Sequence, residues 1–230
     1  MSIAVIRFPG TNNEDDVLKA LGKIPDANPY LVPSRKGLAG LKDADAVVIP
    51  GGFSYGDYLR AGAVASVEVI VEGIRDLAED GKPVLGICNG FQILAEMGLL
   101  PGVLLPNDSS RFICKWIYLK VCETNSIFSE NLENAVLRLP IAHAEGNYFC
   151  SREQLEALRD EQRIPFRYCD SHGETSTESN PNGSLENIAG VTNQRGNVLG
   201  LMPHPERASR QILGSSDGLL ILENFVRAIK

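Results

Sequence analysis

Short runs of hydrophobic residues alternate with helical patterns through the first half of the chain. Residues 3–8 are apolar except for Arg7, and residues 46–49 and 84–87 are uninterrupted apolar runs. Runs of this kind are typical of strands that a parallel sheet buries on both faces. Between the second and third runs, apolar residues recur at helical spacing up to Gly81, namely Val67, Ile70, Val71, Ile74, Leu77 and Ala78. The alternation predicts an α/β fold in which helices cover both faces of a mostly parallel, doubly wound sheet.

Polar residues and glycines indicate where the other helices begin and end. Residues 11–14, Thr-Asn-Asn-Glu, have the order of a capping box, and Gly22 is placed to stop the helix that follows them. Residues 90–97 are expected to form a helix closed by Gly98. Apolar residues at helical spacing over 219–229 predict a final amphipathic helix.

The second half of the chain has a different pattern. Residues 112–122 and 136–142 are longer, more alternating and richer in β-branched or aromatic residues, which predicts a small antiparallel insertion or sheet edge. Residues 171–184 are polar and without periodicity, which predicts a loop. Residues 188–191 and 198–202 return to the strand pattern.

Composition and charge narrow the class of the 230-residue protein. Its 43% hydrophobic and 22% charged residues are typical of a globular protein. Because the sequence contains no internal repeat and no linker-like segment, we expect a single domain over residues 1–230. The net charge of −7 disfavours a protein that binds nucleic-acid phosphates. No stretch reaches the roughly 20 apolar residues of a membrane span, and residues 1–7 lack a signal-peptide layout, so a cytoplasmic protein is expected.

The cysteines do not indicate a disulfide framework or a metal site. They are odd in number and form no Cys-x-x-Cys pair: Cys88, Cys114, Cys122, Cys150 and Cys169. We therefore expect no metal, and most of these side chains to be small buried apolar groups. The chain also has no Gly-x-x-x-x-Gly-Lys-Ser/Thr phosphate loop, so no ATP site or other cofactor is expected in it.

Cys88 is the candidate nucleophile. It stands in Gly86-Ile87-Cys88-Asn89-Gly90, after a strand and before a helix, in the manner of a nucleophile elbow. Glycines two residues away on either side avoid collisions in such a tight turn, and the N-terminus of the helix favours a thiolate. A cysteine that is merely buried at a glycine-rich strand end is the alternative.

A second glycine turn follows another predicted strand. If the two strands are neighbours, the backbone amides of Gly52 and Asn89 are placed to form a two-donor oxyanion hole beside Cys88. The alternative for Pro50-Gly51-Gly52 is a simple turn.

His204 and Glu206 are the candidate base and its orienting acid. They lie in Met-Pro-His-Pro-Glu, residues 202–206, and the two prolines bias the preceding residues toward extended backbone. Residues two apart in an extended chain point to the same side, so Glu206 can hold the His204 ring.

His143 and Glu145 offer the same spacing as a rival pair. They lack the flanking prolines, and a polar turn at a strand end explains them equally well. His172, in the polar loop, is expected to be a solvated surface residue.

Together these motifs resemble the class I, triad-type glutamine amidotransferases, over essentially the whole chain. The matching stretches are residues 6–12 (IRFPGTN), 50–62 (PGGFSYGDYLRAG), 86–92 (GICNGFQ), 143–147 (HAEGN), 180–184 (NPNGS) and 202–207 (MPHPER). Residues 53–57 and 181–184 point to the branch of this family that serves purine biosynthesis.

The resemblance implies a flavodoxin-like domain that hydrolyses glutamine to glutamate and ammonia through a Cys88 thioester. It further implies that Gly51, Phe53 and Gln92 help to hold the substrate. The ammonia would pass to a separate synthetase subunit, which carries ATP and Mg and amidates formylglycinamide ribonucleotide, with a small third subunit in the complex. Two other readings are a free-standing cysteine hydrolase and a binding module in which Cys88 is inert.

Overall fold

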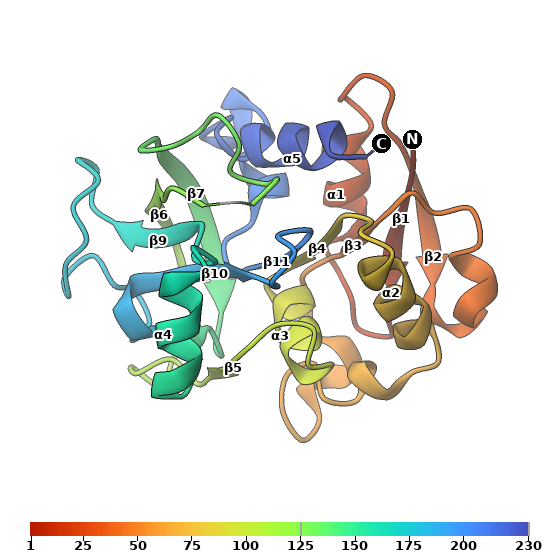
Figure 1. Ribbon diagram of the computed structural model, residues 1–230, viewed down its shortest axis with the longest axis horizontal. Coiled ribbons are helices and arrows are strands. Elements are labelled where there is room, and N and C mark those ends of the chain that lie inside the picture. Colours follow the sequence, from red (N-terminus) through yellow and green to blue (C-terminus); the bar gives the residue numbers. More distant parts are fainter. Residues whose placement is uncertain (125, 230) are drawn as a thin grey trace.

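One large sheet organises the fold. The computed structural model describes residues 1–124 and 126–229, and its main sheet has the strand order β2-β1-β3-β4-β11-β10-β9-β6-β7 (Figure 1). These strands are β1 (Ser2–Arg7), β2 (Asn28–Pro33), β3 (Ala46–Ile49), β4 (Val84–Ile87), β6 (Ile113–Val121), β7 (Val136–His143), β9 (Phe166–Cys169), β10 (Ile188–Thr192) and β11 (Val198–Leu201). A small antiparallel sheet pairs β5 (Val103–Leu105) with β8 (Asn147–Phe149).

The parallel part of the sheet is its buried centre. Strands β2, β1, β3, β4 and β11 pair in parallel, and every residue of β3, β4 and β11 is buried. Burial on both faces explains why these strands are continuous apolar runs in the sequence. The predicted α/β fold class with a parallel central sheet is therefore confirmed.

The antiparallel strands continue the same sheet on the other side of β11. Strand β10 runs antiparallel to β11, and β9, β6 and β7 follow in the same manner. Residues along β7 alternate between half-buried and buried, as expected for a sheet with one covered face. The predicted antiparallel region is thus the edge of the main sheet, accompanied by the β5–β8 pair.

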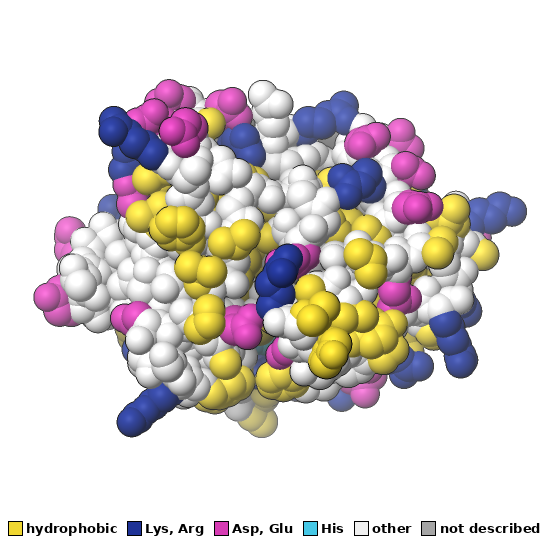
Figure 2. Space-filling view, turned by 90° about the horizontal axis from the view of Figure 1, so that it is seen from below, with side chains coloured by type: hydrophobic (Ala, Val, Ile, Leu, Met, Phe, Trp, Pro, Cys, Tyr) yellow, Lys and Arg dark blue, Asp and Glu magenta, His cyan; other side chains and the backbone are white. Residues whose placement is uncertain are grey.

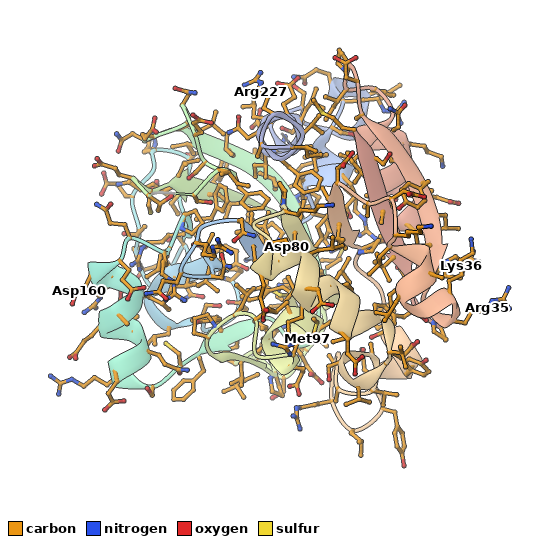
Figure 3. The ribbon with its side chains drawn as sticks, turned by 45° about the vertical axis from the view of Figure 1, so that its right-hand side comes forward. Arg35, Lys36, Asp80, Met97, Asp160 and Arg227 are labelled. Carbon is orange, nitrogen blue, oxygen red and sulfur yellow. The ribbon has the colours of Figure 1, made fainter. Side chains whose placement is uncertain are left out.

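The helices flank this sheet. They are α1 (Glu14–Leu21), α2 (Ile70–Glu79), α3 (Asn89–Glu96), α4 (Arg152–Asp160) and α5 (Gly218–Arg227). Helix α1 contacts α5, and α3 packs on β3, β4 and β11; in Figure 1 the first two lie above the sheet and α3 below it. Charged side chains such as Arg35, Lys36, Asp160 and Arg227 project outward from the periphery (Figure 3).

One predicted helix start and one predicted capping box were wrong. Helix α2 begins at Ile70, because Val67 lies in a separate 3₁₀ turn and its side chain is 82% exposed. Helix α1 begins at the predicted place but has no capping box: its N-cap is Asn13, whose side chain makes no capping hydrogen bond. The hydroxyl of Thr11 instead accepts a hydrogen bond from the amide of Phe8.

The structure also contains elements that the hydrophobic pattern did not indicate, among them β2, β5, β8, β9 and α4. Helix α4 is introduced by a capping box at Ser151 and Gln154 and buries only Leu158, so its apolar face is too narrow to give a periodic signal. That residues 1–230 act as a single domain stays a prediction.

Candidate active site

Cys88 occupies the turn between β4 and α3 in a strained backbone conformation. Its φ of 50° and ψ of −105° lie outside the regions that non-glycine residues favour. A Cβ at Gly86 would lie 2.6 Å from the carbonyl oxygen of Gly90, and one at Gly90 would lie 2.0 Å from that of Ile49. The glycines are therefore required by close backbone contacts, as expected for a nucleophile elbow.

The packing of this turn requires both glycines. We expect Gly90→Ala to lower the free energy of unfolding by about 1–3 kcal/mol and to displace Cys88, because the added methyl group meets backbone atoms of β3 that cannot rotate away. Thermal denaturation and glutamine hydrolysis measure the two effects. Gly81→Ala is the control without a clash, since nothing lies within 4 Å of a Cβ at Gly81, although its φ of 82° adds some backbone strain. If Gly81→Ala impaired glutamine hydrolysis as strongly as Gly90→Ala, the packing argument would be contradicted.

Strand register brings the segment after β11 beside Cys88. Ile87 pairs with Leu201, and the amide of Cys88 donates to the carbonyl of Leu201 (2.8 Å). The thiol of Cys88 lies 3.7 Å from the carbonyl oxygen of Ala142, to which it donates, and the residue is only 5% exposed. The sulfur is thus buried at the end of the parallel strands.

His204 and Glu206 form a buried pair next to Cys88. Nδ1 of His204 lies 2.7 Å from Oε1 of Glu206, and the two side chains are 1% and 0% exposed. Burial by itself lowers the pKa of His204, but the Glu206 carboxylate and the Cys88 thiol outweigh it and raise the pKa to about 9. Within the described residues Nε2 has no hydrogen-bond partner, so it remains available to a proton donor or acceptor at the sulfur.

The glycine turn after β3 lies beside the same cysteine. Ile49 pairs with Gly86, which meets the condition that the two strands be neighbours. A Cβ at Gly51 would lie 2.8 Å from Cε1 of His204 and 3.4 Å from Cβ of Cys88. Gly52 has a φ of 146° and is held by the hydrogen bonds of its neighbours, since Phe53 donates to Gly10 while Gly51 accepts from residue 12.

The side chains of Asn89 and Gln92 connect this turn to α3 and to the segment after β7. The side-chain oxygen of Asn89 accepts a hydrogen bond from the backbone N–H of Ser54 (3.1 Å), and its side-chain nitrogen donates to the side-chain oxygen of Gln92 (2.9 Å). The Gln92 amide donates to the backbone carbonyl of Glu145 (2.6 Å). The backbone N–H of Asn89 belongs to the first turn of α3, where backbone N–H groups have no hydrogen-bond partner within the helix.

Comparison with known proteins decides the family. The model of the CobB/CobQ-like glutamine amidotransferase domain matches residues 1–217. PurQ subunits of phosphoribosylformylglycinamidine synthase from Pyrococcus horikoshii and Aquifex aeolicus are 50% and 51% identical; the matches cover 100% and 96% of this chain, and 99% and 97% of those proteins. A chain of the structure described as PurLQS from Thermotoga maritima is 41% identical, with a TM-score of 0.85 and coverage of 100% of this chain and 99% of that chain.

The chain belongs to the PurQ family of glutamine amidotransferases. It is therefore an enzyme subunit with a glutaminase role in purine biosynthesis, and the family resemblance seen in the sequence is confirmed.

The rival pair of this PurQ family member is not formed. Nδ1 of His143 lies 3.0 Å from the side-chain oxygen of Asn107, and the Glu145 carboxylate instead accepts from the amide of Ala61 (3.3 Å). Burial, assisted by the charge of His204, lowers the pKa of His143 to about 4. His143 is thus a neutral buried ring near pH 7.

Sequence reasoning missed several buried polar residues around the site. Asn13 contacts His204, Asn107 holds His143, and Asn182 and Ser184 donate to the carbonyl of Gly146. Each stands in a short polar segment between elements, so no periodicity indicated it. Residues 180–184, which lie in the predicted polar loop, were the only hint, because they match the family.

The described residues contain neither a membrane-spanning helix nor a metal-binding cluster. No helix among residues 1–124 and 126–229 is long and apolar enough to cross a membrane. In the same part of the chain, no cluster of three or more histidine, cysteine or acidic side chains is arranged to hold a metal ion.

Proposed function

We propose that this chain hydrolyses glutamine to glutamate and ammonia with Cys88 as nucleophile, His204 as acid and base, and Glu206 as the group that orients His204. The observation that best supports this is the buried His204–Glu206 pair, 2.7 Å from Nδ1 to Oε1, beside a cysteine held at positive φ. A pKa of about 9 keeps His204 protonated near pH 7, and an imidazolium beside a cysteine stabilises the thiolate that acts as nucleophile.

In the first half-reaction the Cys88 thiolate attacks the side-chain amide carbon of glutamine. A carbon–sulfur bond forms, and the amides of Gly52 and Asn89 stabilise the resulting oxyanion. His204 gives its Nε2 proton to the amide nitrogen, the carbon–nitrogen bond breaks, and ammonia leaves a thioester on Cys88. The N-terminus of α3 favours the negative charge on the sulfur before the attack.

In the second half-reaction water hydrolyses the thioester. His204, now neutral, takes a proton from the attacking water, and the oxyanion again forms between the two amides. The carbon–sulfur bond breaks, glutamate is released, and the proton on His204 restores the thiolate–imidazolium pair. Gly51, Phe53 and Gln92 are assigned to hold the substrate, since the turn after β3 and the first turns of α3 flank Cys88.

We further propose that the ammonia passes to a synthetase subunit, PurL, in a complex that also contains the small subunit PurS. PurL would bind ATP and Mg and convert formylglycinamide ribonucleotide to formylglycinamidine ribonucleotide, while this chain carries no cofactor. The proposal is supported by the relative from Thermotoga maritima, whose structure is described as PurLQS.

A glutamine analogue that carries an electrophilic diazoketone tests the nucleophile directly. We expect it to alkylate Cys88 in the assembled complex and glutamine to protect against this, because only a thiolate in the substrate pocket meets both conditions. Peptide mass spectrometry identifies the modified residue. The exposed Cys114 is the internal reference, and alkylation of Cys114 without Cys88 would contradict the proposal.

The isolated chain is expected to hydrolyse glutamine slowly and to be stimulated roughly 10²-fold by PurL and PurS with their ligands bound. A factor of this size is what losing one hydrogen-bond donor of an oxyanion hole costs. In the isolated chain, the glycine turn at Gly51-Gly52 can hold the Gly52 amide out of position. In the loop that follows this turn, the side chains of Tyr58 and Leu59 are 70% and 80% exposed. The loop lies at the lower side of the molecule in Figure 1, and Figure 2, which views the molecule from that side, shows hydrophobic side chains gathered there.

Glutamate release with and without the partner subunits measures this stimulation. Tyr58→Ser combined with Leu59→Ser should reduce the stimulation while the slow basal rate persists. Equal rates with and without partners would favour a free-standing cysteine hydrolase.

A further inference from the structure

Asn13 has the position of a helix cap but does not use its side chain as one. It is the N-cap residue of α1, where asparagine usually accepts a hydrogen bond from a backbone amide of the first turn. No such bond is made, although the side chain is almost completely buried at 3% exposure. Because the Asn13 side chain does not cap the helix, its buried position must be explained by other interactions.

The partners of the Asn13 side chain lie in the segment after β11. Its oxygen accepts a hydrogen bond from the Arg207 guanidinium, and its nitrogen lies 3.4 Å from Nδ1 of His204. Because a guanidinium can only donate, it must face the oxygen of the amide, which directs the NH₂ end toward the ring. Arg207 therefore determines which end of Asn13 faces His204.

Nδ1 of His204 consequently has two neighbours of opposite character. The Glu206 carboxylate, 2.7 Å away, accepts a hydrogen bond from protonated Nδ1, whereas the Asn13 NH₂ group can only donate a hydrogen bond to an unprotonated Nδ1. The shorter, charge-assisted contact keeps the proton on Nδ1 and the lone pair of neutral His204 on Nε2. If the carboxylate is removed, the donor from Asn13 favours the other tautomer, in which Nε2 carries the proton.

We propose that Asn13 is a positioning residue of the glutaminase site: oriented by Arg207, it shares Nδ1 of His204 with Glu206 and biases the ring between its two tautomers. This inference rests on the proposed roles of Cys88, His204 and Glu206. Other titratable or charged groups that act on His204 are Cys88 and His143, and Arg207 lies 4.0 Å from the Glu206 carboxylate.

The inference implies that an acceptor at position 13 can replace part of the function of Glu206. In the double variant Asn13→Asp with Glu206→Gln, a carboxylate beside Arg207 faces Nδ1 in place of the amide. The aspartate is isosteric with asparagine, and α1 loses no capping hydrogen bond from the side chain. We expect this variant to hydrolyse glutamine at least 10-fold faster than Glu206→Gln alone.

The experiment measures glutamine hydrolysis in the assembled complex for Glu206→Gln alone and with either Asn13→Asp or Asn12→Asp. The last is the matched control, because it adds the same charge one residue earlier on an exposed side chain. Recovery with Asn13→Asp only supports the proposal; no recovery, or equal recovery with the control, overturns it. If Glu206→Gln alone retained wild-type activity, the proposed role of Glu206 would fail instead.

A second measurement does not depend on the double variant folding. Alkylation of Cys88 by iodoacetamide, followed against pH, reports thiolate formation in the isolated chain. Asn13→Ala removes a donor that faces the protonated ring, so we expect the midpoint to move to lower pH, with Arg207→Lys shifting it less than Arg207→Ala. An unchanged midpoint in Asn13→Ala would overturn the proposal while leaving the triad itself intact.

Discussion

Replacing Cys88 by alanine is expected to abolish glutamine-dependent amidation by the complex with PurL and PurS while sparing synthesis from added ammonium salt. Removing a nucleophile that forms a covalent intermediate costs on the order of 10⁴-fold or more in rate, because the remaining groups of the site have no bond to make. The ATP-dependent step is assigned to the partner, which can take ammonia from solution. The measurement is product formation with each nitrogen source.

The control for this variant must separate chemistry from folding. Cys88 has a φ of 50°, a conformation that is as strained for alanine as for cysteine, so the substitution leaves the backbone cost of the turn in place. Cys114→Ala, at an exposed free cysteine, is the matched substitution and should keep both activities. Equal loss of glutamine-dependent and ammonia-dependent synthesis in Cys88→Ala would make Cys88 a structural residue.

Much of the fold could be predicted because burial on both faces leaves a direct trace in the sequence. Strands β3 and β4 are continuous apolar runs, and the structure gives them the predicted bounds. Strand β2 was missed, since it carries two prolines and pairs only with β1 at the sheet edge. The helix predicted from Val67 began too early because an exposed apolar residue fell by coincidence at helical spacing.

The candidate site could be predicted motif by motif, but not its assembly. The glycine turns and the proline-flanked histidine are local signals, each with a local physical reason. Their meeting depends on the pairing of Ile49 with Gly86 and of Ile87 with Leu201, which is a property of strand order. Asn13 shows the limit of local rules. The capping pattern at 11–14 placed the helix start correctly, yet the Asn13 side chain contacts His204, 191 positions away in the sequence, instead of capping the helix.

The two His-x-Glu pairs are expected to differ sharply in their importance for glutamine hydrolysis. We expect His204→Ala to lower the rate on the order of 10⁶-fold, Glu206→Gln on the order of 10⁴-fold, and His143→Ala less than about 10-fold. His204 is held by a carboxylate that stabilises its protonated form, and its pKa of about 9 lets it pair with the Cys88 thiolate near pH 7. Losing the orienting carboxylate alone leaves an imidazole in the pocket, so that effect is intermediate.

His143 lacks these properties. Its Nδ1 faces the neutral amide of Asn107, and its pKa of about 4 leaves it without a proton to give to ammonia near pH 7. Glutamine hydrolysis in the assembled complex measures all three variants, after circular dichroism has shown that each is folded. Because protonated His204 is needed to deliver the proton, the wild-type rate should also fall as the pH rises through about 9. If His143→Ala were as damaging as Cys88→Ala while His204→Ala kept most activity, the acid–base role would belong to His143.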